Sequence, residues 1–356
     1  MERSVQNSGT IEVRNAHRFD AARVEEWMKQ EVQGYWGPLE VEQFRGGQSN
    51  PTYKLITPKR TYVLRRKPPG ELLPGAHAVD REYRVIKALG GQGFPVAEAF
   101  GLCLDETVIG TAFYVMEMVD GRIFWEAEFP EVPREERPLY FDAMNAAMAR
   151  LHMVDPAAAG LADYGKPGNY FERQIGRWSR QYLGDAEAGR VAAMDRLVEW
   201  LPDNIPAGED EARIIHGDFR CDNMIFHPTE PRVLAVLDWE LSTLGHPLAD
   251  FSYHLMMYRM PAGITTGLAG RDLAALNIPS EADYVAAYCR RTGRDCIPNL
   301  DFYIAFNLFR LSAIVHGIKG RLARGTAASD HADKMAASLE GLADLAWEQA
   351  EKAGAR

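Results

Sequence analysis

Short segments with strand-type patterning characterise the first third of the chain. In Thr61–Lys67, alternation of side chains places Arg65 on the same face as Val63 and places Arg66 on the opposite face. The turn-forming sequence Pro68-Pro69-Gly70 ends this segment. Two further strands are expected at Tyr53–Ile56 and Thr111–Val119.

A helical pattern lies between these strands, at residues 79–89. Val79, Glu82, Ile86 and Leu89 recur at offsets of three, four and three, so they share one stripe of a helix. A glutamate in an apolar stripe needs a cation, because burying an unpaired carboxylate is costly. We therefore expect Arg65 to pair with Glu82. In the alternative, Glu82 lies at the edge of the stripe and reaches water.

Beyond Val119 the patterning is mainly helical. Helices are expected at residues 134–152 and 299–318, and a final packing helix is expected in the alanine-rich region 325–353. Another helix, at about 20–33, precedes the strands. The segment 299–318 is the most apolar, but several polar residues interrupt it, so we expect a buried helix and not a membrane span.

Composition narrows the class of protein. The 356 residues are 46% hydrophobic and 25% charged, which is enough to bury a substantial core. The net charge of -10 argues against a broad surface for nucleic acid or for anionic membranes. The four cysteines show no C-x-x-C spacing, and the amino terminus has no apolar signal segment. These features favour a cytoplasmic location.

Two polar turns carry the candidate chemistry. The first contains His216-Gly217-Asp218, with Asn223 five residues after Asp218, and the second begins at Asp238. Phosphoryl transfer needs a carboxylate to orient the attacking hydroxyl and accept its proton, and it needs oxygen ligands for magnesium. We interpret Asp218 as the catalytic base, and Asn223 and Asp238 as ligands of Mg²⁺ in an ATP-dependent kinase. The alternative is an ordinary hydrophilic turn between two strands, 214–215 and 233–237.

The same motifs resemble a known family. Gly217 replaces the Arg of the protein-kinase loop and Asp-Trp-Glu replaces Asp-Phe-Gly, which resembles aminoglycoside phosphotransferases and choline kinases. The blocks Tyr164–Tyr182, Asp218–Asn223 and Leu237–Asp250 further resemble the phosphotransferase domain that precedes the dehydrogenase in acyl-CoA dehydrogenases of the ten and eleven type.

The resemblance implies an α+β, protein-kinase-like fold of two lobes. A polar tail is expected at residues 1–18, a small antiparallel β-rich N-lobe at 19–119, and a larger, mainly helical C-lobe at 120–356. The C-lobe is expected to contain an acceptor-binding insertion at about 160–210. In the C-lobe, after this insertion, His216 is expected to brace the catalytic loop and Asp250 to hold that loop in place.

The nucleotide-binding residues that the resemblance implies lie in the N-lobe: Ser49, Asn50, Arg65, Glu82, Glu117 and Val119. Gly46-Gly47 lets the next backbone N–H groups meet phosphate oxygens, although Gly-Gly also marks ordinary hairpins. Arg65 takes the place of the usual lysine. The Glu117 carbonyl and the Val119 N–H are expected to hold adenine. For Arg66 and Lys67 we prefer a basic edge strand that faces solvent.

Arg220 stands where many kinases have a lysine that reaches the transferred phosphate, and the alternative is a solvated arginine in a polar turn. The preferred function is therefore an ATP- and Mg²⁺-dependent phosphotransferase acting on the hydroxyl of a small molecule, such as a hydroxy acid or hydroxyacyl thioester. The alternatives are a catalytically silent nucleotide-binding module and an accessory module that works beside an acyl-CoA dehydrogenase.

The insertion supplies candidate acceptor residues. Arg173, Arg177 and Arg180 have helical offsets of four and three, so they point to one side, with Trp178 nearby to contact an acyl chain. Such a face fits an anionic, partly apolar acceptor. In the alternative, the arginines form a solvated helix face that pairs with surface acids such as Glu172 and Asp185.

Overall fold

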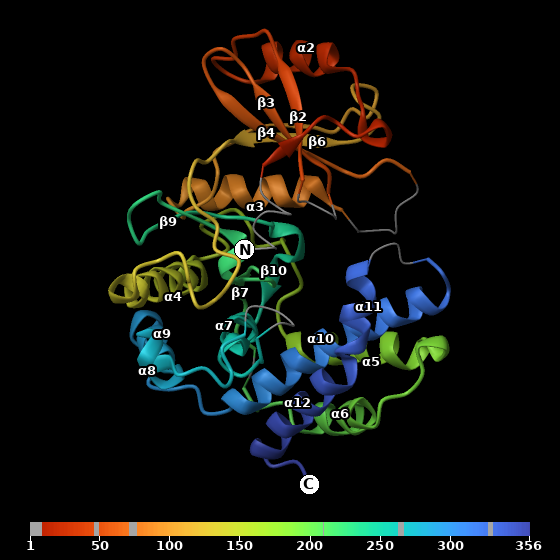
Figure 1. Ribbon diagram of the computed structural model, residues 1–356, viewed down its shortest axis with the longest axis vertical. Coiled ribbons are helices and arrows are strands. Elements are labelled where there is room, and N and C mark those ends of the chain that lie inside the picture. Colours follow the sequence, from red (N-terminus) through yellow and green to blue (C-terminus); the bar gives the residue numbers. More distant parts are fainter. Residues whose placement is uncertain (1–8, 46–49, 71–76, 209, 263–266, 327–329) are drawn as a thin grey trace. The chain divides into compact units, whose positions relative to one another are not determined.

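A six-stranded antiparallel sheet with the order β1-β2-β3-β4-β6-β5 is the centre of the first of two units into which the chain divides (Figure 1). The computed structural model describes residues 9–45, 50–70, 77–208, 210–262, 267–326 and 330–356. The sheet unit comprises residues 1–125, 156–164 and 221–242, and the helical unit comprises residues 126–155, 165–220 and 243–356. The units differ from the contiguous lobes expected above, because two later segments pack with the sheet.

The expected strands are present, and the sheet has further members. Its strands are β1 (Thr10–Ile11), β2 (Glu40–Phe44), β3 (Thr52–Ile56), β4 (Thr61–Arg66), β5 (Ala99–Cys103) and β6 (Phe113–Glu117). Strand β4 lies between β3 and β6, and Arg65 stands opposite Tyr114. Arg65 is therefore carried by an interior strand, whose backbone is paired on both sides.

The expectation that Arg66 faces solvent on an edge strand is wrong. Arg66 is 3% exposed, and its Nε donates a hydrogen bond to Thr111 Oγ1 at 2.9 Å. Its guanidinium carbon lies 5.7 Å from the centre of the Phe19 ring. Lys67 follows the strand and is half-buried. The alternation identified the face of each side chain correctly, but it could not show what covers that face.

Two helices cover opposite faces of the sheet (Figure 1). Helix α2 (Ala21–Glu31) begins after Asp20, whose side chain accepts a hydrogen bond from Ala22 N. Its buried residues Val24 and Met28 pack against the sheet face that includes Leu64. Helix α3 (Val79–Gly91) lies on the other face, with Glu82 turned toward β4. The strand and helix patterns thus place Arg65 and Glu82 on facing surfaces.

The described part of the expected tail belongs to the sheet. Strand β1 pairs with β2, and a short 3-10 helix, η1 (Asn15–His17), follows it. The His17 carbonyl accepts a hydrogen bond of 2.9 Å from the Tyr53 hydroxyl of β3. The expectation of a tail through residue 18 is therefore wrong from Thr10 onward.

A hairpin late in the chain completes the sheet unit. It consists of η4 (Cys221–Asn223), β8 (Met224–Phe226), β9 (Val233–Val236) and η5 (Trp239–Leu241). Val236 N donates to Pro95 O at 2.9 Å, and the Trp239 ring lies 5.9 Å from that of Phe94. These contacts attach the hairpin to the segment that follows α3.

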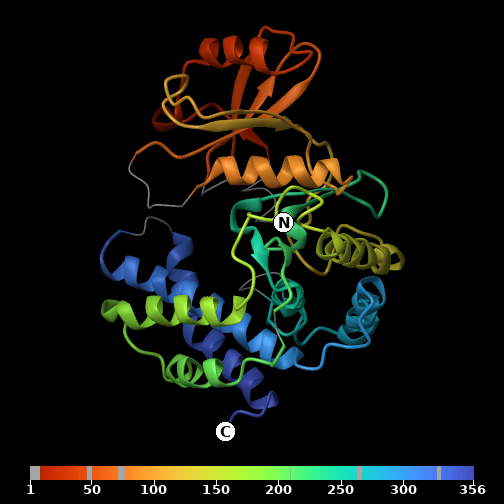
Figure 2. The ribbon, with the colours of Figure 1, turned by 180° about the vertical axis from the view of Figure 1, so that it is seen from behind.

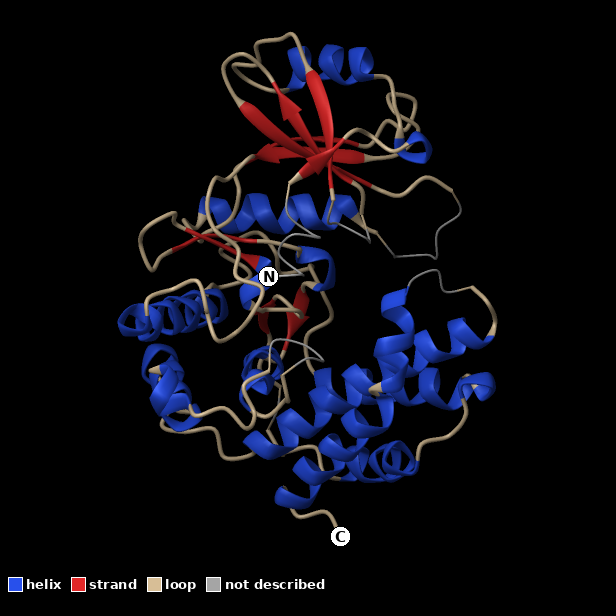
Figure 3. Cartoon of the chain, in the orientation of Figure 1, coloured by secondary structure: helices blue, strands red, loops and turns tan. Residues whose placement is uncertain are grey.

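The helical unit contains most of the remaining elements (Figures 2 and 3). They are η2 (Arg134–Glu136), α4 (Arg137–Met153), α5 (Tyr170–Gly184), η3 (Ala186–Ala188), α6 (Ala192–Asp203), β7 (Arg213–Ile215), β10 (Thr243–Gly245), α7 (Pro247–Leu255), η6 (Met256–Tyr258), α8 (Leu273–Leu276), α9 (Glu281–Thr292), α10 (Leu300–Ala323), α11 (Asp330–Ala337) and α12 (Leu339–Lys352). Strand β7 pairs with β10, whereas β8 pairs with β9. The polar turn at 216–223 therefore connects two strands that do not pair with each other.

Helix α10 is the buried helix expected at residues 299–318, and α5, α6, α7 and α12 pack against it. Its polar residues are used inside the unit: Asn307 donates to Ala249 O at 2.8 Å, and His316 bonds Gly189 O at 2.7 Å. Among the helices that the structure describes, none is long and apolar enough to cross a membrane.

Candidate functional site

Arg65 is the centre of a partly buried ionic cluster in the sheet unit. Its Nη2 lies 2.6 Å from Asp238 Oδ1, and its Nε lies 2.8 Å from Glu82 Oε2. The Nε contact is an ion pair in which the N–H does not point at the oxygen. Glu240 adds a third carboxylate, 3.6 Å from Nη2. The expected pairing of Arg65 with Glu82 is therefore present.

Glu82 needs this cation because it is 1% exposed. Burial raises the pKa of the Glu82 carboxyl, and the neighbouring Arg65 opposes that rise. Burial disfavours the Arg65 charge, but the Glu82 and Asp238 carboxylates raise the pKa of Arg65 above its ordinary value. Removing either partner would leave a buried charge, which is the costly outcome for such pairs. The alternative in which Glu82 reaches water is wrong.

Asn50 and Tyr114 hold the Glu82 carboxylate in place. Asn50 Nδ2 donates to Oε1 at 2.8 Å, and the Tyr114 hydroxyl donates to Oε2 at 3.1 Å. The amide oxygen of Asn50 lies 2.9 Å from His77 Nδ1. The Asn50 side chain thus braces Glu82, whereas the expected contact of its backbone N–H with phosphate stays a prediction. Ser49 lies outside the described residues.

The expected adenine contacts lie at the end of β6. Glu117 is the last residue of that strand, and its N–H donates to Glu98 O at 2.8 Å. Val119 follows in an irregular segment and is partly exposed. The roles of the Glu117 carbonyl and the Val119 N–H stay predictions.

The hairpin brings the two expected metal ligands to neighbouring positions. Leu237 N donates to Asn223 O at 2.8 Å, so the residue before Asp238 is bonded to Asn223. Asp238 itself has a φ of +64°, a left-handed backbone conformation that is uncommon outside glycine. Within the described part of the chain, no three His, Cys, Asp or Glu side chains form a metal centre. This pair of oxygen donors suits Mg²⁺, which usually takes one or two protein ligands with phosphate and water.

In the helical unit, Asp250 fixes the backbone of the catalytic loop that follows β7. Asp250 is 1% exposed, and its carboxylate accepts hydrogen bonds from His216 N at 2.7 Å and Gly217 N at 2.8 Å. Burial would raise the pKa of Asp250, but His152, His216 and these N–H donors hold it below its ordinary value. Gly217 has a φ of +85°, which explains a glycine at this position.

Asp218 is a partly exposed carboxylate of this loop, with 21% of its side chain accessible. Its Oδ1 accepts a hydrogen bond of 2.6 Å from the Tyr253 hydroxyl and lies 3.3 Å from Arg220 Nε. Its backbone N–H donates to His216 Nδ1 at 3.2 Å, which agrees with a bracing role for His216. The structure therefore brings Asp218 and Arg220 together, and it adds Tyr253.

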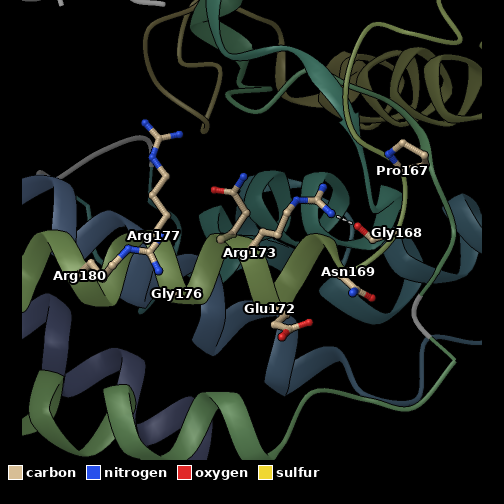
Figure 4. A pocket seen from close by; sticks show the side chains of 9 residues that line it. Pro167, Gly168, Asn169, Glu172, Arg173, Gly176, Arg177 and Arg180 are labelled. Atoms are coloured by element: carbon tan, nitrogen blue, oxygen red, sulfur yellow. Dashed lines mark hydrogen bonds between the residues drawn. The ribbon is translucent and has the colours of Figure 1, made fainter. Parts of the chain in front are cut away.

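The arginines of the insertion line a cavity of about 720 Å³ on α5 (Figure 4). Arg173, Arg177 and Arg180 share this side of the helix, as their spacing predicts. Arg173 donates to the carbonyl of Gly168 and, at 2.7 Å, to that of Lys166, so it also ties the preceding loop to the helix.

Trp178 lies on the opposite, buried stripe of α5 and is 9% exposed. The Arg177 guanidinium carbon is 5.0 Å from the centre of its ring. Asp185 pairs with Arg324 at 2.7 Å instead of with the insertion arginines. Among the residues that the structure describes, Arg177 and Arg180 have no carboxylate within ion-pair distance.

This chain is similar to known proteins in sequence and in fold. The model of the phosphotransferase enzyme family matches residues 40–298, which include Arg65, Asp218 and Asp238. The chain belongs to this family. A putative aminoglycoside phosphotransferase from Ralstonia eutropha has 51% sequence identity and a TM-score of 0.87, with 94% of this chain and 99% of that chain covered.

More distant structures have the same kinase-like α+β fold. Choline kinase from Cryptosporidium parvum has a TM-score of 0.65 at 10% identity, covering 94% of this chain and 97% of that chain. A thermostable mutant of an aminoglycoside phosphotransferase, solved with ADP and hygromycin B, has a TM-score of 0.60 at 14% identity, covering 92% of this chain and 98% of that chain.

Two curated relatives carry names of the acyl-CoA dehydrogenase family. Member 11 from chicken is 44% identical over 348 residues, which are 96% of this chain and 44% of that protein. Member 10 from mouse is 44% identical over 322 residues, which are 90% of this chain and 30% of that protein. The phosphotransferase thus spans less than half the length of these relatives.

Sequence reasoning missed Tyr253 and His77, and it missed the contact of the predicted residue Asn50 with Glu82. Tyr253 contacts Asp218, and Asn50 joins His77 to Glu82, across 27 to 35 residues of chain. One signal was available for the first contact: Asp250, Tyr253 and His254 are polar residues at helical spacing in a helix whose other residues, apart from Ser252, are apolar. No comparable pattern points to His77 or to the contact between the Asn50 side chain and Glu82.

Proposed function

We propose that this phosphotransferase is an ATP- and magnesium-dependent kinase that phosphorylates a hydroxyl group of a small molecule. The observation that carries the proposal is the fixed position of Asp218. The backbone of its loop is bonded to Asp250, and its carboxylate is held by Tyr253 while remaining partly exposed. A carboxylate that is held in place and remains partly exposed can orient an attacking hydroxyl and accept its proton.

The sheet unit offers the groups that a nucleotide needs. Arg65 is a permanent cation that can contact phosphate oxygens, and its direction is set by Glu82. Asn223 and Asp238 would hold Mg²⁺, which neutralises charge on the nucleotide phosphates when it is bound. The ADP found in the aminoglycoside phosphotransferase of similar fold supports the assignment of a nucleotide.

The test is acceptor-dependent release of ADP by the purified protein. Hydroxy acids, hydroxyacyl thioesters, aminoglycosides and choline are compared at equal concentration, with and without Mg²⁺, and the phosphorylated product is identified by mass spectrometry. Asp218→Asn serves as the control for contaminating kinases. If no acceptor raises ADP release above that of Asp218→Asn, the catalytically silent nucleotide-binding module replaces the kinase.

We further propose that the acceptor is anionic and that Arg177 and Arg180 bind its charged group. Both side chains line the cavity on α5, which Glu172 also lines, and neither has a carboxylate within ion-pair distance among the described residues. An anion would therefore gain charge-assisted hydrogen bonds from them. Arg173 is less suited to this role, because its guanidinium holds two backbone carbonyls. The names of the curated relatives favour an acyl acid or acyl thioester as this anion, and a dehydrogenase as the functional partner.

Charge reversal tests this part separately. The double change Arg177→Glu with Arg180→Glu should raise the KM for an anionic acceptor roughly 10- to 100-fold while leaving the KM for ATP within about twofold. Arg290→Glu, on the exposed side of α9, is the matched control. If both KM values stay unchanged, or if cationic acceptors are preferred by the wild type, the anionic assignment fails and the kinase assignment stands.

A further inference from the structure

Helix α7 directs three polar side chains at the catalytic loop. Tyr253 and His254 follow Asp250 by three and four residues, so the three side chains lie on one face of the helix. Asp250 accepts from the backbone at His216 and Gly217. His254 Nδ1 lies 3.1 Å from Phe219 O. Two of the three therefore hold backbone groups of the loop, on either side of Asp218.

His254 is a neutral donor in this arrangement. Burial lowers the pKa of His254 to about 4, so the ring carries no charge at neutral pH. A carbonyl only accepts hydrogen bonds, which places the ring proton on Nδ1, facing Phe219 O. Nε2 then accepts from the Tyr284 hydroxyl at 2.7 Å. The loop backbone is thus fixed without any contribution from Tyr253.

Tyr253 differs from its neighbours because it reaches the Asp218 side chain itself. The distance of 2.6 Å between its hydroxyl and Oδ1 is typical of a charge-assisted O–H···O⁻ bond. Burial and the Asp218 carboxylate raise the pKa of Tyr253, so its hydroxyl stays protonated and must be the donor. The Arg310 guanidinium carbon lies 5.2 Å from the ring centre, and Arg310 also donates to Gly217 O at 2.9 Å. Arg310 therefore contacts both the Tyr253 ring and the backbone of the catalytic loop.

We propose that Tyr253 is a positioning residue for the kinase reaction, because its hydroxyl fixes the rotation of the Asp218 carboxylate toward the acceptor. This inference rests on the proposed function. In that reaction the acceptor oxygen bonds the γ-phosphorus, the bond from that phosphorus to the bridging oxygen breaks, and its electron pair leaves with ADP. The acceptor proton passes to Asp218 and then to solvent. The direction of the carboxylate decides whether the attacking oxygen is aligned.

The test is Tyr253→Phe, which removes the hydroxyl and keeps the ring. The kcat should fall roughly 10- to 100-fold, with both KM values within about twofold of wild type, since alignment and not binding is lost. In the Asp218→Asn background the same change should have no further effect on kcat, because Tyr253 acts through Asp218. A residue that only supports the fold would lower the rate in both backgrounds.

The control is Tyr182→Phe. Tyr182 also donates to a carboxylate, Asp195 Oδ1 at 2.5 Å, and it is 1% exposed in the same unit. Its removal should lower the Tm at least as much as Tyr253→Phe does, because the hydroxyl also accepts a hydrogen bond of 2.8 Å from the buried Val191 N, but it should leave kcat unchanged. If Tyr253→Phe does not fold, Tyr253→Met is measured in the same way, because methionine adapts to irregular cores.

The outcomes separate the two proposals. A wild-type protein without any kinase activity overturns the proposed function and this inference with it. An active wild type whose kcat is unaffected by Tyr253→Phe overturns only the role of Tyr253. A fall in the KM of the acceptor would also overturn it, because that result would make the Tyr253 hydroxyl a competitor of the acceptor and not a support of Asp218.

Discussion

Replacing Asp250 by asparagine should release the catalytic loop without changing the shape of the side chain. In the wild type both carboxylate oxygens accept backbone hydrogen bonds, from His216 N at 2.7 Å and Gly217 N at 2.8 Å. An amide has one oxygen, so in either orientation its NH₂ group faces one of these N–H donors. At least one buried backbone donor therefore loses its acceptor.

The cost follows from these contacts. A hydrogen bond to a charged acceptor contributes about 1.5–3 kcal/mol, and an unsatisfied buried donor costs about 1–3 kcal/mol. The neutral amide escapes the desolvation of a carboxylate, which offsets part of the loss. We expect the loop to lose about 2–4 kcal/mol of local stability. Since each 1.36 kcal/mol corresponds to a factor of ten, its amides should exchange with solvent roughly 30- to 900-fold faster.

Hydrogen–deuterium exchange of the peptide that covers residues 214–219 measures this loss directly. Asp203→Asn, the same change at an exposed position of α6, is the control and should leave the exchange of that peptide unaltered. Kinase activity should fall as well, because the loop carries Asp218. Exchange within about threefold of wild type would refute the assignment of Asp250 as the residue that holds the loop.

The same carboxylate predicts a pH dependence. The folded state lowers the pKa of Asp250, so its ionised form contributes stability that is fully present above the unfolded value of about 3.9. This contribution is lost as the pH falls through the lower, folded value. Protection of the loop in the wild type should therefore decrease in acid, whereas the Asp250→Asn loop should lack this part of the pH dependence. Identical acid profiles for the two proteins would contradict the linkage.

Three further changes test the residues of the proposed reaction. Asp218→Asn should leave ATP binding, measured by calorimetry, unchanged and should lower turnover roughly 100- to 10,000-fold; turnover within a few-fold of wild type would contradict its role. Asp238→Ala should abolish the Mg²⁺ dependence of nucleotide binding, and an unaltered Mg²⁺ titration would exclude it as a ligand. Arg220→Ala should lower kcat more than it weakens ATP binding if its charge stabilises the transferred phosphate, as its position beside Asp218 predicts, and equal losses in both would leave it a structural residue.

The ionic pair of the sheet unit could be predicted because two independent periodicities converge on it. Alternation along β4 fixes the face of Arg65, and the stripe of α3 fixes that of Glu82. The prediction for Arg66 failed for a related reason. Alternation identifies two faces, but it does not show that β4 is interior or that Phe19 and Thr111 cover the second face. The interior position of β4 and the burial of Arg66 depend on segments far from β4 in the sequence, which the alternation within β4 does not describe.

The division of the chain into its two units could not be predicted from local sequence patterns either. The hairpin of β8 and β9 packs with the sheet unit, although it follows the catalytic loop directly in the sequence. Bonds such as that from Val236 N to Pro95 O decide this placement, and they join residues more than a hundred positions apart. Tyr253 and Arg310 escaped prediction in the same way, because their roles depend on how α7 and α10 pack within the helical unit.

Charge and direction are supplied by different residues in each of the two units. Arg65 and Asp218 carry the charges and are recognisable from motifs, whereas Glu82 and Tyr253 set the directions of those charges. A phosphotransferase could therefore keep every motif residue and still be silent if a directing partner were lost, since a misdirected carboxylate gives little alignment of the acceptor. The motifs alone do not separate the kinase from the silent module. The presence of both directing partners in this chain is a separate reason to favour the kinase.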